Sequence, residues 1–481
     1  MTASATTLDP GAAAPALPSD RAFLGHPKGL GWLAFCEFWE RFSYYGMQAL
    51  LVLYMTQYLL LPEHVGGVAG MDTLRRVLES VFGKLTPLGL ASQVYGWYAG
   101  LVYLTPILGG LVADRVLGRT RTVVLGASLM ALGHFLMAFE ASFLLALACL
   151  LAGVGCFKGN IAAQVGDLYG PKDTRRASAF QIFMLAVQLA VILSPLVCGS
   201  LGEKVAWHWG FGAAGVGMVI GLFVYLAGRQ WLPAETSRAA ARADLASGRT
   251  QKRPPMTSAE KGRLALLVAL VPVLSMSIVG NQQIFNAYVV WSKAHIDLVF
   301  FGWEIPVTWL QAVDALISTF TMLATIAFWR WYSTKRREPA EIVKIAIGSF
   351  IAAGAPALLM IAAGLVEGSD RKLGFGWTLA FGVVNDFGFA NILPVGLALY
   401  SRTAPRSLEG LMIGVYYLHL FIGNTFVGWL GGLLEKMSGA AFWGLHAMLV
   451  LGAAFALLAV RLVFGRLLAT ADREPEEPAD R

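Results

Sequence analysis

Long apolar runs dominate the chain, and short polar segments separate them without any sustained alternation of polar and apolar residues. A helix that spans a bilayer needs about 20 mostly apolar residues, and twelve runs meet that requirement. These predicted helices cover residues 30–60, 93–114, 121–140, 143–168, 177–201, 209–231, 262–291, 305–329, 341–365, 374–400, 408–434 and 441–465. Within the longer loop at 62–92, residues 72–82 predict a short surface helix. The pattern therefore predicts an all-α integral membrane protein without β-strands.

The longest polar segment, residues 233–261, is rich in Ala, Ser, Pro and charge, which is typical of a linker. It divides the predicted helices into two sets of six. This is the layout of the major facilitator fold, in which two halves rock around a central site. We therefore expect a disordered tail at 1–29, a six-helix bundle at 30–232, the linker at 233–261, a second six-helix bundle at 262–466 and a tail at 467–481.

Charge is scarce in the chain and unevenly placed. Only 14% of the residues are charged and 57% are hydrophobic, whereas soluble domains carry roughly a quarter charged residues. The net charge of +7 does not indicate nucleic-acid binding, because the basic residues lie in short loops between apolar runs. Most of the 37 Lys and Arg residues lie on the side of the two termini and the linker. The positive-inside rule therefore predicts that both termini are cytoplasmic.

The first predicted helix carries ionisable residues at bilayer depth, where a Lys or Arg costs roughly 2.5–3.5 kcal/mol. At about 100° per residue, Glu37, Arg41, Tyr44 and Gln48 share one stripe of this helix, and Glu40 flanks the stripe. Glu37 precedes Arg41 by four residues, which is the favourable order for a helical ion pair. One face of the helix therefore offers two carboxylates, a guanidinium and a phenol.

Lys158 lies in the fourth predicted helix, among small residues such as Gly155 and Gly159 that allow close helix packing. Its ammonium has no obvious way to reach water, so we expect it to pair with Glu37 or Glu40. The alternative is that these charges serve only helix packing. Packing alone does not require several ionisable groups at this depth, so we favour a functional cluster.

Three motifs resemble those of one transporter family. The run Glu37-Phe38-Trp39-Glu40-Arg41-Phe42-Ser43-Tyr44-Tyr45 resembles the ExxERFxYY signature of the proton-coupled oligopeptide transporter (POT) family. The segment from Tyr103 to Pro106, followed by the G-x-x-A-D-R-x-x-G-R run from Gly110 to Arg119, is similar to the family's second helix and the loop after it. The segment from Gly153 to Asn160 resembles its fourth-helix motif.

The resemblance implies a function and assigns roles to residues. It implies a symporter of the bacterial inner membrane that imports di- and tripeptides with protons, acts as a monomer, and uses no catalytic residue, metal or other cofactor. It assigns proton coupling to Glu37, Glu40, Arg41 and Lys158, and a conformational lock to Asp114 and Arg115. From the resemblance and from the residues that stand at or near the family's site positions, we expect substrate binding by Arg41, Tyr44, Tyr45, Tyr103, Lys158, Gln188, Gln283, Asp314, Phe389 and Tyr416.

Several positions depart from the family pattern near the expected substrate site. Gln48 and Asn281 stand where the family has a charged gate pair, so we expect the outer mouth to close through apolar contacts and amides without an ion pair. Phe389 stands where the tenth helix usually carries a glutamate that is taken to meet the substrate's amino group. Asp314, at a usual Asn position on the eighth helix, is expected to replace that glutamate, with Asp386 as the second candidate.

Other interpretations remain open from the sequence. Phe389 leaves room for a symporter of another small solute, such as nitrate or an organic acid, and Asp314 is alternatively a solvated or packing residue. A membrane enzyme is disfavoured because the chain has no G-x-S-x-G, HExxH or Walker motif. A channel is disfavoured because two six-helix halves joined by a linker favour alternating access.

Overall fold

The computed structural model describes residues 20–170, 173–233, 256–404 and 408–469. Most of the predicted N-terminal tail, linker and C-terminal tail therefore lie outside the described residues. The first half contains α1 (Lys28–Tyr54), η1 (Met55–Leu59), α2 (Pro62–Val65), α3 (Met71–Phe82), α4 (Pro87–Leu101), α5 (Thr105–Val112), η2 (Ala113–Leu117), α6 (Arg119–Leu136), η3 (Glu140–Ser142), α7 (Phe143–Asp167), α8 (Arg175–Ser194), η4 (Pro195–Gly199), α9 (Ser200–Lys204), α10 (Trp207–Gly228) and η5 (Arg229–Trp231).

The second half is also almost entirely helical. It contains α12 (Ser258–Ser277), α13 (Val279–Gln282), η6 (Gln283–Phe285), α14 (Ala287–His295), β1 (Val299–Phe300), β2 (Trp303–Glu304), α15 (Trp309–Ser333), α16 (Glu341–Val366), α17 (Gly376–Thr403), α18 (Glu409–Gly431) and α19 (Gly439–Ala469). The short surface helix predicted at 72–82 is confirmed as α3. The two-residue strands β1 and β2 pair antiparallel in a hairpin, so the expectation of a chain without strands is wrong at this one turn.

Within the described residues, eight helical segments are long and apolar enough to cross a membrane, and two bent pairs of helices qualify when each pair counts as one span. The helices α1 and α6 have 27 and 18 residues. Four charged residues lie in α1 and two arginines begin α6, and with these two helices the number of spans is twelve. The chain is therefore a multi-pass membrane protein with the number of spans that the sequence predicts. Many large apolar side chains on the spans remain exposed, such as Leu462 at 86% and Phe320 at 69%, as lipid-facing positions require.

Two of the spans are broken, which the apolar pattern did not predict. The break between α4 and α5 precedes Thr105-Pro106 and bends the span by 40°. Proline lacks a backbone N–H and disfavours helix at the residue before it, which explains the break. The span predicted at 262–291 is divided into α12, α13, η6 and α14, with a bend of 48° after α12.

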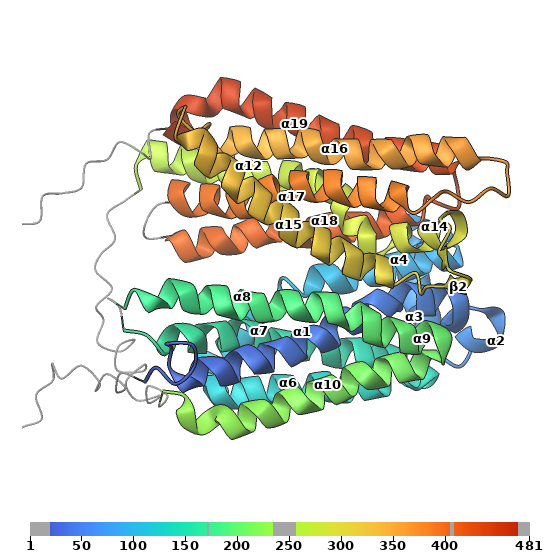
Figure 1. Cartoon of the computed structure of the whole chain (residues 1–481), viewed down its shortest axis with the longest axis horizontal. Helices are drawn as coiled ribbons and strands as arrows, with labels where there is room; N and C mark the ends of the chain where they lie inside the picture. Colours follow the sequence, from blue (N-terminus) through green and yellow to red (C-terminus); the bar gives the residue numbers. More distant parts are fainter. Residues whose placement is uncertain (1–19, 171–172, 234–255, 405–407, 470–481) are drawn as a thin grey trace, which may run out of the picture.

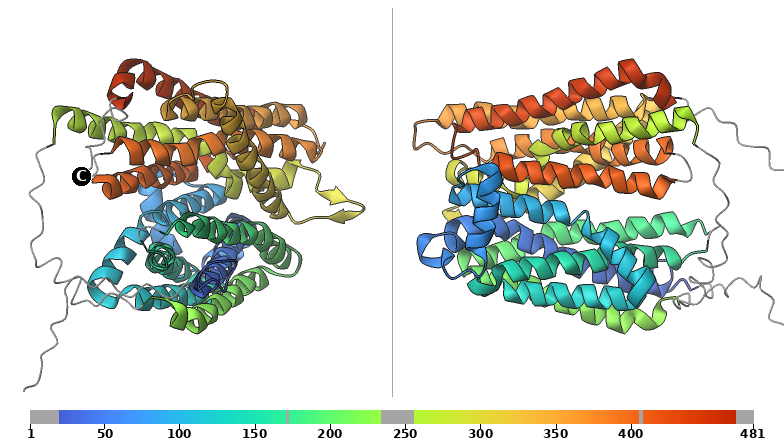
Figure 2. Two further views of the ribbon diagram at one scale, coloured as in Figure 1. Left: turned by 60° about the vertical axis from the view of Figure 1, so that its left-hand side comes forward. Right: turned by 180° about the vertical axis from the view of Figure 1, so that it is seen from behind.

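The two halves form two bundles that lie one above the other in Figure 1, with α1 and α6–α10 in one bundle and α12–α19 in the other. The described chain ends and both sides of the 234–255 segment lie at one end of the molecule, which we call the linker end. The hairpin β1–β2 and the helices α2 and α3 lie at the opposite end, which we call the hairpin end (Figures 1 and 2).

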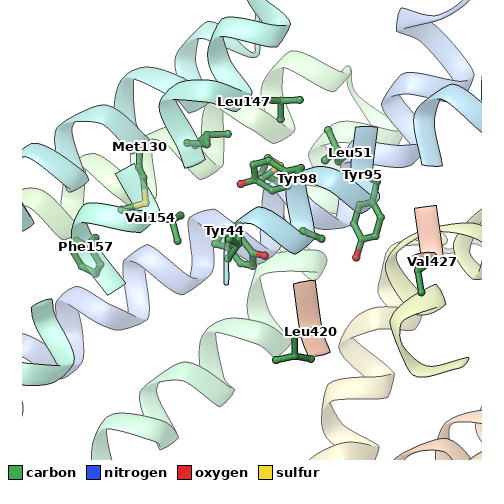
Figure 3. Packing of buried hydrophobic residues seen from close by; sticks show 14 of the residues in the cluster. Tyr44, Leu51, Tyr95, Tyr98, Met130, Leu147, Val154, Phe157, Leu420 and Val427 are labelled. Atoms are coloured by element: carbon green, nitrogen blue, oxygen red, sulfur yellow. The ribbon is translucent and has the colours of Figure 1, made fainter. Parts of the chain in front are cut away.

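The halves meet most closely where α4 packs on α18. A Cβ atom placed on Gly96 would lie 2.7 Å from the Cα atom of Gly428, so both positions need glycine for this approach. Buried apolar residues from both halves belong to one continuous core. Figure 3 shows this core around Tyr95 and Tyr98 of α4, with Leu420 of α18 nearby. The core thus joins the two bundles next to Tyr44 of the expected substrate site.

Candidate transport site

The first-helix cluster is present as the sequence predicts. Nε of Arg41 donates a hydrogen bond to Oε1 of Glu37 at 2.9 Å and lies 2.6 Å from Oε2 of Glu40. All three side chains are buried, with Glu40 fully excluded from solvent. Nη2 of Arg41 and Oε2 of Glu37 have no hydrogen-bond partner. The guanidinium therefore holds two carboxylates and keeps an unused donor at the same time.

Aromatic side chains surround the cluster and extend to the second half. The guanidinium of Arg41 lies 5.6 Å from the centre of the Tyr44 ring, within the range of a cation–π contact. Tyr45 packs edge-on against Tyr44 and faces Phe285 of η6, with ring centres 6.2 Å apart. The site therefore has one wall in each bundle.

Lys158 differs from the prediction in its partner. Among the described residues no carboxylate lies within 4.0 Å of its Nζ, which instead lies 5.1 Å from the ring centre of Tyr103. Glu37 and Glu40 already face Arg41, which explains why neither approaches Lys158 more closely. Tyr103 in turn stacks on Tyr417 of α18, with ring centres 6.4 Å apart. The ammonium thus lies against an aromatic ring and forms no close ion pair with a described residue.

Two residues predicted to bind substrate are buried and hydrogen-bonded inside the second half. Gln283 is fully buried, its Nε2 lies 2.9 Å from Nε2 of His446, and its Oε1 accepts from Nδ2 of Asn286 and from the backbone N–H of Ala287. These bonds stabilise the break between α13 and α14. Tyr416 is 1% exposed and donates its hydroxyl to the carbonyl oxygen of Leu393. In this conformation both side chains are hydrogen-bonded within the second half, and their predicted role in substrate binding stays a prediction.

The predicted lock at the linker end has no ion pair in this conformation. Asp114 and Arg115 lie in η2, are exposed, and form no ion pair with any described residue. Arg119 at the start of α6 pairs with Asp167 at the end of α7 instead. The turn after α5 is therefore held by Arg119, the last residue of the motif, together with Asp167, which lies outside the motif.

An ion pair and a helix cap join the halves at the hairpin end. Glu203 of α9 accepts hydrogen bonds from the backbone N–H groups of Val307 and Thr308 at 3.2 and 3.0 Å, and from the Thr308 hydroxyl at 2.7 Å. Lys293 lies 4.0 Å from Glu203 and donates to Gln57 at 2.6 Å. We call these residues the hairpin-end latch. The expectation that no ion pair closes this mouth is therefore wrong.

The residues predicted for the gate lie elsewhere and do not meet. Gln48 donates to the hydroxyl of Tyr95 at 3.0 Å within the first half. Asn281 accepts from Gln282 at 3.0 Å within the second half. Gln188 does cross between the halves, and it donates to the Thr319 hydroxyl of α15 at 3.0 Å.

The second half contributes two acids and a phenyl ring. Asp314 of α15 is half-buried, and Asp386 of α17 is 2% exposed. Phe389, one turn after Asp386, packs against the core. Neither carboxylate forms an ion pair with any described residue, and Oδ2 of Asp386 has no hydrogen-bond partner.

The sequence interpretation missed Tyr417 and Glu203. Tyr417 is the position after the predicted Tyr416, and a shift of one residue on a helix turns the side chain by about 100°. Glu203 lies between two apolar runs, where a solvated loop acid is the ordinary interpretation. Neither residue belongs to a motif. Their roles become visible only from the contacts that Tyr417 makes with Tyr103 and that Glu203 makes with Thr308 across the two halves.

Comparisons with known proteins agree on the class and the family. The model of the POT family matches residues 120–247. The chain is 30% identical to the uncharacterized transporter YclF of Bacillus subtilis over 91% of this chain and 94% of that one. It is 28% identical to the peptide transporter YePEPT of Yersinia enterocolitica over 86% and 89% of the two chains. A crystal structure of the peptide transporter POT in complex with sulfate has a TM-score of 0.77 and 27% identity, over 94% and 98% of the chains.

The fold and the site thus define a membrane transporter of the major facilitator type. The chain belongs to the POT family of proton-coupled oligopeptide transporters.

Proposed function

We propose that the protein is a symporter that imports di- and tripeptides together with protons by alternating access. The observation that carries the proposal is the arrangement of Arg41 between Glu37 and Glu40 with a guanidinium donor left unused. Relatives described as di-/tripeptide transporters in Lactococcus lactis share up to 29% identity over most of their length. A structure of peptide transporter POT with alafosfalin shares 28% identity.

Protonation of a carboxylate next to Arg41 would couple the proton to the substrate. With both acids ionised, the guanidinium is balanced by two negative charges, and a substrate carboxylate meets repulsion. When one acid takes up a proton, it loses its negative charge and attracts Arg41 less strongly. The guanidinium is then able to bind the carboxylate of the peptide. The unpaired ammonium of Lys158 provides the second cation for that carboxylate. The hydroxyls of Tyr44, Tyr45 and Tyr103 supply hydrogen bonds to the peptide.

The second half would bind the other end of the peptide. Asp314 offers a carboxylate to the substrate's ammonium, and Phe389 lines the wall beside it. An acidic wall favours a substrate with an amino group and opposes an anion such as nitrate. This feature supports a peptide over the other small solutes that the sequence leaves open.

The hairpin-end latch supports a conformation that is closed at one mouth. The ion pair and hydrogen bonds between the halves given above lie at the hairpin end or at mid-membrane. We infer that the hairpin end faces outward and that both termini and the linker are cytoplasmic, in the inner membrane of a bacterium. We propose a monomer as the working unit, as the family resemblance implies. The proton is the only coupling ion that this function requires.

Uptake into liposomes tests the proposal. Purified protein in vesicles with a neutral interior should concentrate labelled dialanine from an acidic medium, and a protonophore should prevent the accumulation. Equilibration without accumulation would indicate a channel-like path, and the absence of dialanine uptake or binding would contradict the peptide function.

A further inference from the structure

A charged pocket lies at the linker end of the second half, away from the transport site. Its volume is about 720 Å³, far more than the roughly 30 Å³ that one water molecule takes up in the liquid. Its walls are the loop between α15 and α16, the start of α16, and the last turns of α17 and α19. All of these segments belong to one half, so the pocket is separate from the substrate site between the halves.

The charges that line this pocket do not balance. Four basic and two acidic side chains line it, namely Arg337, Lys344, Arg402, Arg461, Glu338 and Glu341. Lys344 pairs with Glu338, and Arg402 pairs with Glu341. Both acids are therefore already engaged, and the lining keeps an excess of two positive charges.

Arg337 and Arg461 carry this excess charge. Neither of them forms an ion pair with any described residue. Arg337 is exposed in the loop before α16, whereas Arg461 is half-buried on α19. A Cβ atom on Gly465 would clash with Nη1 of Arg461, so the glycine makes room for the guanidinium along the helix. A cation that is partly withdrawn from water is costly without a counter-ion, and the pocket therefore favours an anion.

Neighbouring side chains indicate that the pocket lies at the surface of the membrane. Nζ of Lys344 lies 4.6 Å from the ring centre of Trp329, near the end of α15, and tryptophan is enriched at the level of the lipid headgroups. Leu462 and Val463, which follow Arg461 on α19, are 86% and 72% exposed, as apolar side chains are where lipid covers them. Lipid headgroups of the leaflet at the linker end are therefore within reach of the pocket.

We propose that this pocket binds the headgroup of a phospholipid with two phosphate groups, taken from the membrane leaflet at the linker end. The two negative charges of such a headgroup match the excess charge of Arg337 and Arg461. A guanidinium also donates paired hydrogen bonds to phosphate oxygens, and basic pockets between membrane-spanning helices suit such headgroups. The bound lipid connects the linker ends of α16, α17 and α19. The inference does not depend on which solute the protein transports.

Lipid binding to the purified, delipidated protein tests the inference. Native mass spectrometry in detergent gives the dissociation constant of added cardiolipin, a phospholipid with two phosphates. The same titration uses phosphatidylglycerol, which has one phosphate and one net negative charge, and phosphatidylcholine, which has no net charge. We expect cardiolipin to bind most tightly and phosphatidylcholine most weakly.

Variants with matched changes in charge locate the binding site. Arg337→Gln combined with Arg461→Gln should weaken cardiolipin binding about 25-fold, because it removes the excess charge of the pocket. The same two positions changed to lysine keep that charge and should keep most of the affinity. Arg371→Gln combined with Lys372→Gln alters two exposed basic residues at the hairpin end and is the control, which should bind cardiolipin as the wild type does.

Three outcomes would overturn the inference. The first is the same cardiolipin affinity in the double Gln variant of the pocket and in the wild type. The second is an equal loss of affinity in the hairpin-end control, because total charge would then account for the binding. The third is displacement of cardiolipin by an equal concentration of inorganic pyrophosphate, which would make the pocket a site for free anions. Dialanine uptake tests the transport function separately, so the failure of one proposal leaves the other standing.

Discussion

The first-half cluster and the second-half acid pair each contain two carboxylates, but only the first-half cluster contains a cation that compensates their negative charge. Arg41 lies between Glu37 and Glu40, whereas Asp314 and Asp386 have no cation among the described residues. The first site can change its affinity for an anion by taking up a proton, because its cation is already in place. The second site can only receive a cation. A zwitterionic peptide complements both, with its carboxylate toward the first half and its ammonium toward the second.

Removing the titratable groups of the first half should have the largest effect. Glu37→Gln combined with Glu40→Gln leaves Arg41 permanently unbalanced and removes the coupled proton. We expect gradient-driven accumulation of dialanine in liposomes to be abolished, while counterflow, which needs no gradient, persists. Counterflow also serves as the control for folding. Accumulation that survives the double change would show that the coupled proton binds elsewhere.

Removing the second cation of the first half should be nearly as severe. Lys158→Ala deletes an ammonium that forms no close ion pair with a described residue and is available to a substrate carboxylate. The loss of one partner from a desolvated charged pair costs about 2–5 kcal/mol, which is roughly 30-fold to several thousand-fold in affinity. Uptake of dialanine should fall to background. Cys149→Ser on the same helix is the matched control and should transport normally, and a wild-type rate for Lys158→Ala would exclude the assignment.

Opening the hairpin-end latch should have a smaller effect. Glu203→Ala removes the acceptor of three hydrogen bonds that cap the start of α15, at about 1–3 kcal/mol. Hydrogen–deuterium exchange of the segment 305–310 should become about 5- to 150-fold faster, because the Val307 and Thr308 amides lose their partner. Glu63→Ala, an exposed acid at the same end, is the control. Unchanged exchange in Glu203→Ala would show that the latch does not hold the halves together.

Most of the fold follows from the sequence, since apolar runs of spanning length identify the helices. The breaks are harder to predict. Thr105-Pro106 could have indicated the bend after α4, but the break after α12 depends on hydrogen bonds that Gln283 makes to distant residues such as His446. The pair of Glu37 and Arg41 was predictable because both residues lie on one helix. The latch was not, because its members come from distant segments, such as Glu203 and Thr308, which are 105 residues apart, and they meet only when the halves pack.

The position of Lys158 also shows that contacts between distant segments are hard to predict from the sequence. Sequence reasoning correctly found a cation at bilayer depth, and it assigned a carboxylate partner because buried charge needs compensation. The structure gives both available acids to Arg41 and leaves Lys158 above Tyr103. Competition between two cations for the same acids is a matter of three-dimensional geometry, and the pattern of residues cannot resolve it.

The most direct test of the difference between the halves is a double comparison at Asp314. The affinities of dialanine and N-acetyl-dialanine are measured by calorimetry on wild-type protein and on Asp314→Asn. If the second half binds the ammonium, Asp314→Asn weakens dialanine by about 30-fold or more and changes the acetylated ligand little. The losses from acetylation and from substitution then do not add, because both remove the same interaction. Equal weakening of both ligands would contradict the account and leave Asp314 with a structural role.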